Sequence, residues 1–556
     1  MNQPTKNSLS ENGLTEPGLT PLPVRPRELA IIGLAILFFW FGSFGLLSLS
    51  DPRESEFGGH PDEASHYVTG LMVFDYLKGH LGEHPLRFAE MYYEFYPKVA
   101  IGHFPPGFYV IEAVWFLLFG ESTNSVLALQ SLSGALIAGL VAWLVIAVGG
   151  EWFVALSAGA LVCTLPLLQR YVGMVMSDSW LSLFCLLSAL SFGLYLRRPG
   201  YRYSLLFGCL AAATILIKGS GLMLAFVPPI SLILTRRYHL FFSRAFWVAA
   251  LPVVGICGPW MVVTYKITEE GMVQAWSLGY LAEAVPYFLL QAYSTLGFAL
   301  LALTLLGALR SFNGRVATGR VPEFNAVMLA LPLGLVVTYA LIPVGFEQRY
   351  LLPAVGPALF FFAQGVRRVA EMLEGRLRQP VPGLVVLIAA CVFYFVEIFE
   401  LPEKGFRGFS PLIARMGLPD EGQGKLILVS SDARGEGALV AGVAARDQRP
   451  RNQVLRGTKV LSTSDWMGRG YELSHESDEA LLQFLERKNI DWLVLDNSIP
   501  TERVVKHHEQ LSRAIDAYPE RFELVEETMI LRRYAGERQD AELYRILPAS
   551  EGVPNP

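Results

Sequence analysis

Residues 122–150, STNSVLALQSLSGALIAGLVAWLVIAVGG, contain no charged side chain over 29 consecutive positions. The hydrocarbon core of a bilayer is roughly 30 Å thick, and about 20 apolar helical residues cross it. Only a helix satisfies its own backbone hydrogen bonds in that environment. The stretch therefore predicts a transmembrane helix, and other charge-free windows of the chain can be read in the same way.

Ten further windows of this kind occur along the chain. They are 29–50, 152–169, 179–196, 203–217, 219–235, 245–265, 284–309, 324–346, 350–366 and 379–396. Apolar residues make up 52% of the 556 positions and charged residues 17%, whereas soluble domains carry about 25% charged residues. These values predict a polytopic α-helical membrane protein with about eleven transmembrane helices. They exclude a disordered protein and an ordinary soluble enzyme.

The net charge is −5, which gives no positive field for nucleic acid, so no nucleic-acid partner is expected. All five cysteines lie inside the apolar windows. A disulfide framework in a soluble part is therefore excluded, and the cysteines are expected to be structural thiols.

Basic residues predict the orientation of the chain, because short cytoplasmic connections retain Lys and Arg. Basic clusters alternate with ends that carry a single cation, namely Arg170, Lys218, Lys266 and Arg349. The pattern predicts a cytoplasmic N-terminus, with residues 1–28 as a disordered tail. It places the four lone cations on the outer side of what we expect to be a bacterial inner membrane.

Residues 104–120, FPPGFYVIEAVWFLLFG, are apolar but short, and Glu112 interrupts them. Counting them as a span would place Arg197 and Arg198 on the wrong side. We therefore expect a helix that lies in, or re-enters from, the outer interface. A genuine short span is the alternative.

The same topology predicts two large pieces outside the cytoplasm. One is the first outer loop, residues 51–121, within a transmembrane domain of residues 29–400. The other is residues 401–556, where the strand-like runs 425–431 and 490–498 alternate with helix-like runs 437–447 and 478–489. This alternation predicts a soluble α/β domain.

The first outer loop carries a dense polar segment, His60-Pro61-Asp62-Glu63-Ala64-Ser65-His66, and five of the nine histidines. A carboxylate there could act as general base for an acceptor, and we assign that role to Asp62, with Glu63 beside it. One alternative is a zinc or manganese ion held by His60, Asp62 or Glu63, and His66. Another is a solvated loop in which Asp62 caps a helix.

The lone cations on the same side complete a candidate site. A phosphate leaving group needs positive charge as its bond breaks, and Lys218 and Arg349 supply it. Either residue alone is equally well explained as a cation at the end of a helix. Several of them on the same side as an acidic pair favour a site.

Four motifs in this order resemble the GT-C fold glycosyltransferases. They are Asp62-Glu63, His103-Phe104-Pro105-Pro106-Gly107-Phe108-Tyr109, Lys218-Gly219-Ser220-Gly221-Leu222 and Gln348-Arg349-Tyr350-Leu351-Leu352-Pro353-Ala354. The protein O-mannosyltransferases and the bacterial aminoarabinose transferases of lipid A are most similar, over residues 29–400. This chain has His-Phe-Pro-Pro where His-Pro-Pro is the commonest form.

The resemblance implies transfer of a sugar, with inversion, from a polyprenyl phosphate donor to a lipid, glycan or protein acceptor outside the cytoplasm. It implies that Asp62 orients the acceptor, with Glu63 beside it, and that Lys218 and Arg349 contact the donor phosphate. Weaker assignments are Arg170 for the phosphate and, for acceptor binding or support, His60, His66, His103, Tyr350 and Asp178. A divalent metal stays open as a cofactor.

A transporter or flippase of a lipid-linked saccharide is the alternative function. That class typically has internal repeats and discontinuous helices that meet at the bilayer midplane. The sequence shows no repeated half, and its candidate residues gather toward one surface. The pattern therefore favours the transferase.

Overall fold

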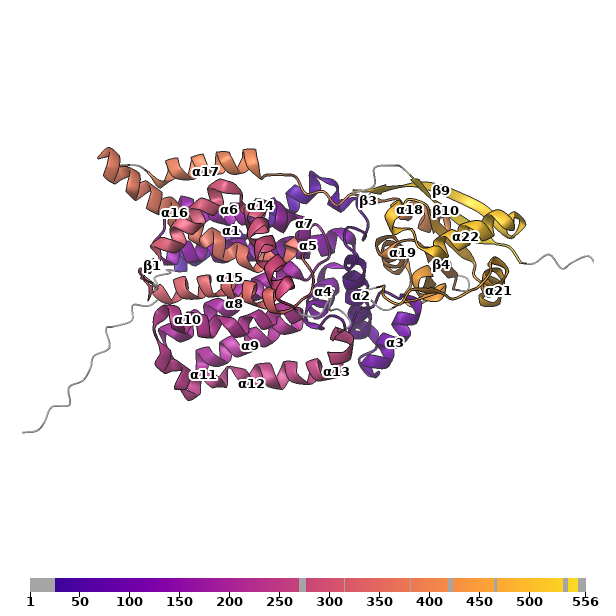
Figure 1. Cartoon of the computed structure of the whole chain (residues 1–556), viewed down its shortest axis with the longest axis horizontal. Coiled ribbons are helices and arrows are strands. Elements are labelled where there is room, and N and C mark those ends of the chain that lie inside the picture. The colour runs from indigo at the N-terminus through magenta and orange to yellow at the C-terminus, as the bar shows by residue number, and fades with distance from the viewer. Residues whose placement is uncertain are drawn as a thin grey trace, which may run out of the picture.

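The computed structural model describes residues 26–269, 277–314, 316–380, 382–418, 424–464, 468–533 and 539–548. A bundle of helices and a smaller α/β domain lie side by side along the longest axis of the molecule (Figure 1). The chain is a polytopic helical membrane protein with a C-terminal α/β domain, as the sequence predicts.

Each of the eleven apolar windows falls on helical structure. The bundle contains α1 (Pro26–Ser48), α5 (Thr123–Ala147), α6 (Trp152–Thr164), α7 (Pro166–Val172), α8 (Asp178–Arg197), α9 (Tyr201–Ile217), η2 (Gly219–Phe226), α10 (Val227–Thr235), η3 (Tyr238–Phe242), α11 (Arg244–Val248), α12 (Ala250–Pro252), η4 (Val253–Cys257), α13 (Gly258–Glu269), α14 (Leu278–Arg310), α15 (Pro322–Leu341), η5 (Gln348–Leu351), α16 (Leu352–Leu377) and α17 (Gly383–Glu397). A short hairpin of β1 (Phe312–Asn313) and β2 (Val316–Ala317) joins α14 to α15.

Not every window is one long helix. Within the described residues, six helices are long and apolar enough to cross a membrane, or seven if α6 and α7 count as one. These two meet at an angle of 56° at Pro166, which has no N–H to continue the hydrogen bonds of α6. The helices α9 and α17 are shorter, and window 219–235 begins as the 3₁₀-helix η2. Eleven crossings thus stays a prediction.

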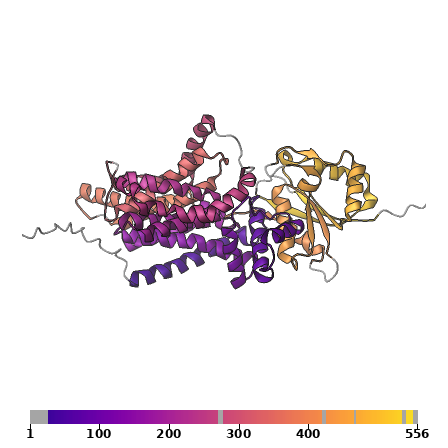
Figure 2. The ribbon, with the colours of Figure 1, turned by 90° about the horizontal axis from the view of Figure 1, so that it is seen from below.

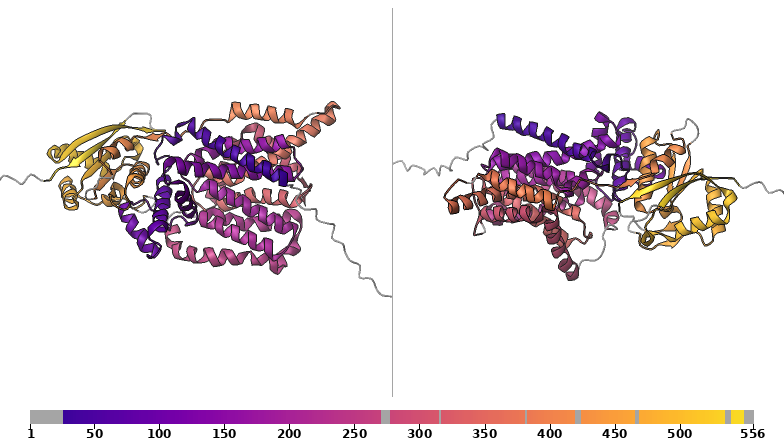
Figure 3. Two further views of the ribbon diagram at one scale, coloured as in Figure 1. Left: turned by 180° about the vertical axis from the view of Figure 1, so that it is seen from behind. Right: turned by 90° about the horizontal axis from the view of Figure 1, so that it is seen from above.

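The direction of α1 shows which loops share an end of the bundle. It begins at the end farther from the C-terminal domain and runs toward it (Figures 2 and 3). The long loop that follows α1 therefore lies at the domain end. It contains η1 (Asp51–Arg53), α2 (Glu63–Gly79), α3 (Pro85–Phe95) and α4 (Gly107–Phe119), and α2 packs on the C-terminal domain.

The ambiguous segment 104–120 forms α4, a helix of 13 residues. One face packs on α2, α5 and α9 and buries Glu112 completely. The opposite face exposes apolar side chains, among them Val110, Val114 and Leu118. The helix thus has one largely exposed apolar face, which fits both an interfacial helix and a short span.

The C-terminal domain is built on a six-stranded sheet in the order β3-β9-β10-β8-β4-β5. Its elements are β3 (Phe406–Arg407), α18 (Phe409–Arg415), β4 (Leu426–Ser430), α19 (Ala433–Arg446), β5 (Gln453–Arg456), α20 (Gly457–Val460), β6 (Ser462–Thr463), β7 (Glu472–Leu473), α21 (Asp478–Lys488), β8 (Trp492–Asp496), η6 (Thr501–Arg503), α22 (Lys506–Ala517), η7 (Pro519–Arg521), β9 (Phe522–Arg532) and β10 (Gln539–Ile546). Strand β4 pairs in parallel with β5 and β8, whereas β10 pairs antiparallel with both β8 and β9.

The helices α14 and α16 cross at very short distance. A Cβ atom added to Gly365 would lie 1.9 Å from the carbonyl oxygen of Leu303, and one on Gly307 would lie 1.9 Å from that of Phe361. Only glycine allows two helix backbones to approach in this way. Because α16 begins at Leu352, this crossing also fixes the segment just before it, which carries Arg349.

Candidate functional site

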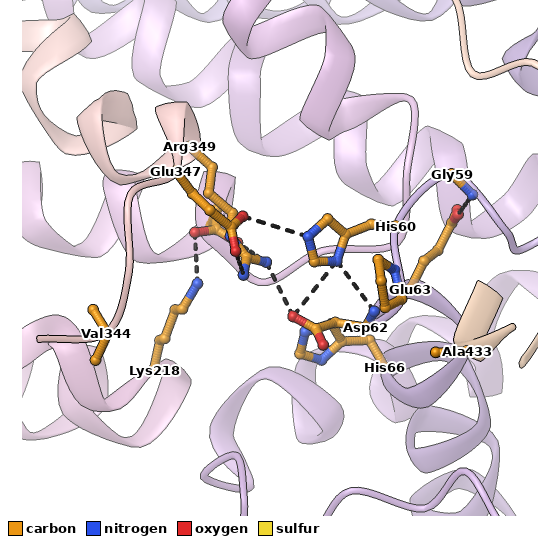
Figure 4. Close-up of polar contacts among 12 residues, drawn as sticks. Gly59, His60, Asp62, Glu63, His66, Lys218, Val344, Glu347, Arg349 and Ala433 are labelled. Carbon is orange, nitrogen blue, oxygen red and sulfur yellow. Dashed lines mark hydrogen bonds and ion pairs between the residues drawn. The ribbon is translucent and has the colours of Figure 1, made fainter. Parts of the chain in front are cut away.

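Asp62 lies in the turn that leads from the first loop into α2. The backbone N–H of Asp62 donates to His60 Nδ1 at 3.1 Å, and the N–H of Glu63 donates to the carbonyl of His60 at 3.1 Å. Although Asp62 occupies the N-cap position of α2, its side chain makes no capping hydrogen bond. The capping interpretation is therefore wrong, and the carboxylate points instead toward Arg349 (Figure 4).

Arg349 connects three carboxylates at the domain end of the bundle. It lies in η5, between α15 and α16, and its side chain is buried. Nη1 lies 3.2 Å from Asp62 Oδ2 and 3.9 Å from Asp178 Oδ2, while Nε lies 2.7 Å from Glu347 Oε2. The guanidinium group is thus shared among side chains from three separate parts of the sequence.

Lys218 approaches the same centre from the end of α9. Its Nζ donates to Asp178 Oδ1 at 2.6 Å and lies 5.8 Å from the centre of the Tyr350 ring. Tyr350 in turn stacks on Tyr339, with ring centres 4.4 Å apart. Asp178 is the first residue of α8, so the start of this helix positions the carboxylate that lies between Lys218 and Arg349.

His60 contacts two carboxylates of the cluster. Its Nδ1 lies 3.1 Å from the backbone nitrogen of Asp62 and 3.5 Å from Asp62 Oδ2, and its Nε2 lies 3.4 Å from Glu347 Oε2. His60 therefore connects the turn that carries Asp62 to the loop that carries Arg349 (Figure 4).

His66 lies one helical turn beyond Asp62 and is fully buried. Its Nδ1 is 3.1 Å from the hydroxyl of Tyr109, and its ring packs against Phe104 at 4.7 Å. Burial lowers the pKa of His66 to about 3, so the ring is neutral at physiological pH. Among the described residues, its Nε2 has no hydrogen-bond partner.

The carboxyl of Asp62 is ionised at neutral pH. Burial alone would raise its pKa, but His60 and Arg349 outweigh burial and hold the pKa of Asp62 below its ordinary value. With His66 neutral, the carboxylates of Asp62, Asp178 and Glu347 face the two cations Lys218 and Arg349. The cluster is therefore nearly balanced by its own side chains.

Glu63 does not point into this cluster. Its carboxylate is completely buried and accepts a hydrogen bond from Lys404 Nζ at 2.5 Å. It also accepts hydrogen bonds from the backbone N–H groups of Gly59 at 2.9 Å and Val175 at 3.2 Å. Glu63 therefore binds a neighbouring basic group and supports the loop, while Asp62 alone of the acidic pair faces Arg349.

Two other predicted residues lie at the margin. Arg170 in α7 is half-buried and makes no hydrogen bond or ion pair with the cluster within the described part of the chain. His103 is in the turn before α4, next to Phe104, whose ring packs on His66.

The four residues weighed as metal ligands do not come together as one ligand set. Glu63 faces Lys404, and the Nδ1 of His66 faces Tyr109. In the ranges that the structure describes, no group of three or more His, Cys, Asp or Glu side chains is placed to hold a metal ion.

Sequence reasoning overlooked two residues of this region. Glu347 is two residues before Arg349, in a motif that was already singled out, and its charge was the available signal. Lys404 lies in the linker between α17 and β3, 341 positions from Glu63, and no spacing rule points to such a pair.

Comparison with known proteins places this geometry on a known fold. No family model and no curated protein matches the chain by sequence. Among solved structures, ArnT from Cupriavidus metallidurans bound to undecaprenyl phosphate matches with a TM-score of 0.54 and 12% identity, over 94% of this chain and 98% of that one. The apo state of ArnT matches with a TM-score of 0.56 and 13% identity, over 93% and 97%.

A third match is the archaeal oligosaccharyltransferase AglB from Archaeoglobus fulgidus, in complex with an inhibitory peptide and a dolichol-phosphate. It has a TM-score of 0.51 and 13% identity, over 84% of this chain and 69% of that one. Both ArnT and AglB are enzymes of the GT-C fold. The chain has the GT-C fold. The match to ArnT includes the C-terminal domain, because it extends over nearly the whole of both chains.

Proposed function

We propose that this GT-C protein is a membrane glycosyltransferase that moves a sugar, with inversion, from a polyprenyl phosphate donor to a lipid, glycan or protein acceptor. One observation carries the proposal. Asp62 lies 3.2 Å from Arg349, and Arg349 shares Asp178 with Lys218, although these residues are far apart in sequence. A base beside two cations suits attack on a carbon whose leaving group is a phosphate.

The solved relatives support the donor class. ArnT has been seen with undecaprenyl phosphate and AglB with a dolichol-phosphate, and both ligands are polyprenyl phosphates. A fold that presents its site at one end of a helical bundle suits such a donor. The phosphate can reach the site while the isoprenoid chain stays beside the apolar faces of the helices.

The reaction is a single displacement. A hydroxyl oxygen of the acceptor, held by Asp62, forms a bond to the anomeric carbon as the bond from that carbon to the phosphate oxygen breaks. The electron pair leaves on polyprenyl phosphate, and the hydroxyl proton passes to the Asp62 carboxylate. Because His60 and Arg349 keep the pKa of Asp62 low, Asp62 mainly orients the hydroxyl and receives its proton late.

Lys218 and Arg349 act on the departing phosphate in this proposal. Lys218 carries a compact charge and needs only to exchange its contact with Asp178 for a phosphate oxygen. Arg349 has a second task, since its Nη1 also fixes the carboxylate of Asp62. Arg170, at the margin, contributes long-range charge, while His60, His66, His103, Tyr350 and Asp178 support the site.

The proposed orientation places this end of the bundle outside the cytoplasm of a bacterial cell, with the N-terminus inside. The loop of residues 51–121 and the domain of residues 401–556 then both face the outer side. This arrangement suits a donor whose sugar is already exposed at the outer leaflet.

The test is transfer by the full-length protein in liposomes that contain sugar-labelled polyprenyl phosphate lipids extracted from the host membrane. We expect Asp62→Asn to lower the transfer rate by about 10²- to 10⁴-fold, because it removes the charge that orients the acceptor. The matched control is Glu83→Gln, because Glu83 is an exposed acid of the same loop whose carboxylate pairs with His80. Full activity of Asp62→Asn would refute the assignment of the base. Movement of labelled lipid across the bilayer without any transfer would favour the flippase instead.

A further inference from the structure

The C-terminal domain packs directly on the elements that carry Asp62. Helix α19 lies against α2, and their contact is closest at Gly437. A Cβ atom added to Gly437 would lie 3.0 Å from Cβ of Ala64 and 3.1 Å from Cε of Lys98. Ala64 is two residues beyond Asp62, so the domain rests on the first turn of α2.

Lys98 lies at the centre of this contact. Its side chain is buried, and its Nζ donates to the carbonyl oxygen of Ala433, at the start of α19, at 3.0 Å. The same Nζ lies 3.4 Å from the carbonyl oxygen of Pro61, the residue immediately before Asp62. One ammonium group thus joins the backbone of the C-terminal domain to the backbone of the Asp62 turn.

An apolar side chain of similar length would make neither contact. Two backbone carbonyls from different segments need a donor with more than one N–H on a long flexible stem, and lysine has three. The neighbouring cation Arg456 is already occupied by Glu436, at 2.8 Å, and by the carbonyl of Pro97, at 3.3 Å. Lys98 is therefore the donor that reaches Pro61.

The opposite side of the same loop is held by the linker that enters the domain. The carboxylate of Glu56 accepts the backbone N–H groups of Phe409 at 3.0 Å and Ser410 at 2.6 Å, which are the first residues of α18. Lys404 makes its buried ion pair with Glu63. The loop from Glu56 to Glu63 is thus attached to the C-terminal part of the chain on both sides.

We propose that Lys98 is a positioning residue through which the C-terminal domain holds the Asp62 turn in the conformation that permits transfer. This inference rests on the proposed function. It gives the C-terminal domain a part in the catalytic geometry. Lys98 contacts the backbone before Asp62, so its effect is on where the carboxylate lies.

The experiment compares Lys98→Met, Lys98→Arg and Gly437→Val in the full-length protein with the same labelled donor lipids. We expect Lys98→Met and Gly437→Val to lower kcat by about 10- to 100-fold through misplacement of the carboxylate. The donor KM should stay within about 3-fold, because the phosphate-binding cations are untouched. Lys98→Arg should restore part of the rate, since it keeps a charged donor. Lys488→Met, on the exposed face of α21, is the control.

Hydrogen exchange gives a second measurement that does not depend on activity. The backbone N–H groups of Asp62, Glu63 and His66 are all hydrogen-bonded within the turn or the first turn of α2. In Lys98→Met we expect these amides to exchange about 10-fold faster, while those of α21 stay unchanged. If Lys98→Met does not fold, Lys98→Arg and Gly437→Ala provide the same measurements with smaller changes.

Unchanged kcat and unchanged exchange in Lys98→Met and Gly437→Val, or in the milder pair, would overturn the inference. That outcome differs from failure of the proposed function, which would appear as transfer activity retained in Asp62→Asn. A loop that exchanges faster in Lys98→Met while Asp62→Asn stays fully active would retain the attachment and reject the catalytic role of Asp62.

Discussion

Lys218 offers a single-residue test of the proposed phosphate site. It ends α9 and reaches Asp178, and its head group is the compact charge proposed for the donor phosphate. We expect Lys218→Met to weaken binding of undecaprenyl phosphate in nanodiscs by about 10- to 100-fold, the loss typical of one charge-assisted hydrogen bond. Lys218→Arg should bind with intermediate affinity.

The control for that measurement is Lys266→Met. Lys266 is another lone cation of the sequence pattern, but it lies in the exposed part of α13. We expect wild-type affinity in this variant. Equal affinity of Lys218→Met and the wild-type protein would exclude Lys218 from the phosphate site.

Lys98 predicts a pH dependence of stability. Burial, together with the nearby Arg456, lowers the pKa of Lys98 to about 7, while an unfolded lysine titrates at about 10.4. Between these values the unfolded chain binds one more proton than the folded chain, so the free energy of unfolding rises with pH. The slope approaches about 1.4 kcal/mol per pH unit. In Lys98→Met this contribution is absent, because methionine does not titrate.

The measurement is thermal unfolding of both proteins in detergent at pH 7, 8 and 9. The unfolding temperature of the wild-type protein should rise relative to that of Lys98→Met across this range. Parallel profiles for the two proteins would show that Lys98 titrates normally in the folded state.

For single residues, the sequence indicates which side chains form the site more clearly than it indicates what they contact. Asp62, Lys218 and Arg349 are recognisable because ionisable residues beside apolar helices are costly to keep. Lys98 is not recognisable, since a lysine in a polar loop is unremarkable until its burial is known. The position of Glu63 was equally hidden, because it depends on a linker residue 341 positions away.

At the scale of elements, the crossing of α14 and α16 determines where Arg349 lies. We expect Gly365→Leu to lower the free energy of unfolding by about 1–3 kcal/mol or more. The reason is that the leucine side chain would clash with the backbone of α14. Gly375→Leu is the matched control on the same helix, since a Cβ atom there meets nothing within 4 Å. Unfolding in detergent compares the two, and equal stability would show that the helices separate without cost.

The motif Lys218-Gly219-Ser220-Gly221 has a structural explanation at the same scale. A Cβ atom on Gly221 would lie 2.9 Å from backbone atoms of Thr214 and Ile215, so the chain folds back tightly onto the end of α9. That turn directs Lys218 toward Asp178. The sequence shows the glycines, but it does not show which backbone they approach.

Charge-free windows locate helices well and their breaks poorly. The bend of 56° at Pro166 and the 3₁₀-helix η2 both occur inside windows of uniform apolar character. Hydrophobicity reports whether a segment suits the membrane. It carries little information about backbone geometry, which packing against neighbouring helices decides.

At the scale of the whole molecule, the arrangement predicts a specific topology. Helix α8 starts in the site at Asp178 and runs for 20 residues to Arg197, so its C-cap residue Arg198 lies at the end of the helix away from the site. In a variant without the native cysteines, Lys488→Cys should react with an impermeant thiol reagent in intact cells. Arg198→Cys should react only after the inner membrane is opened. Reaction of both sites in intact cells, or the reverse pattern, would contradict the proposed orientation.

The contact between the first loop and the C-terminal domain was beyond sequence reasoning. It joins residues more than 300 positions apart, such as Asp75 with Arg449 at 2.8 Å and Tyr96 with Asp447. Composition predicts that the first loop and the C-terminal domain are polar, and the pattern of basic residues predicts that both lie on one side of the membrane. Their mutual burial depends on surface shape, which a single sequence does not reveal.

The surplus of carboxylates around Arg349 and Lys218 has a consequence for turnover. In the unliganded protein both cations already have internal counterions, so free inorganic phosphate must compete with Asp62, Asp178 and Glu347 for them. A donor tethered in the bilayer has the advantage of high local concentration in this competition. In the proposed reaction, the same carboxylates pair with the cations again when polyprenyl phosphate leaves, which returns the site to its unliganded state.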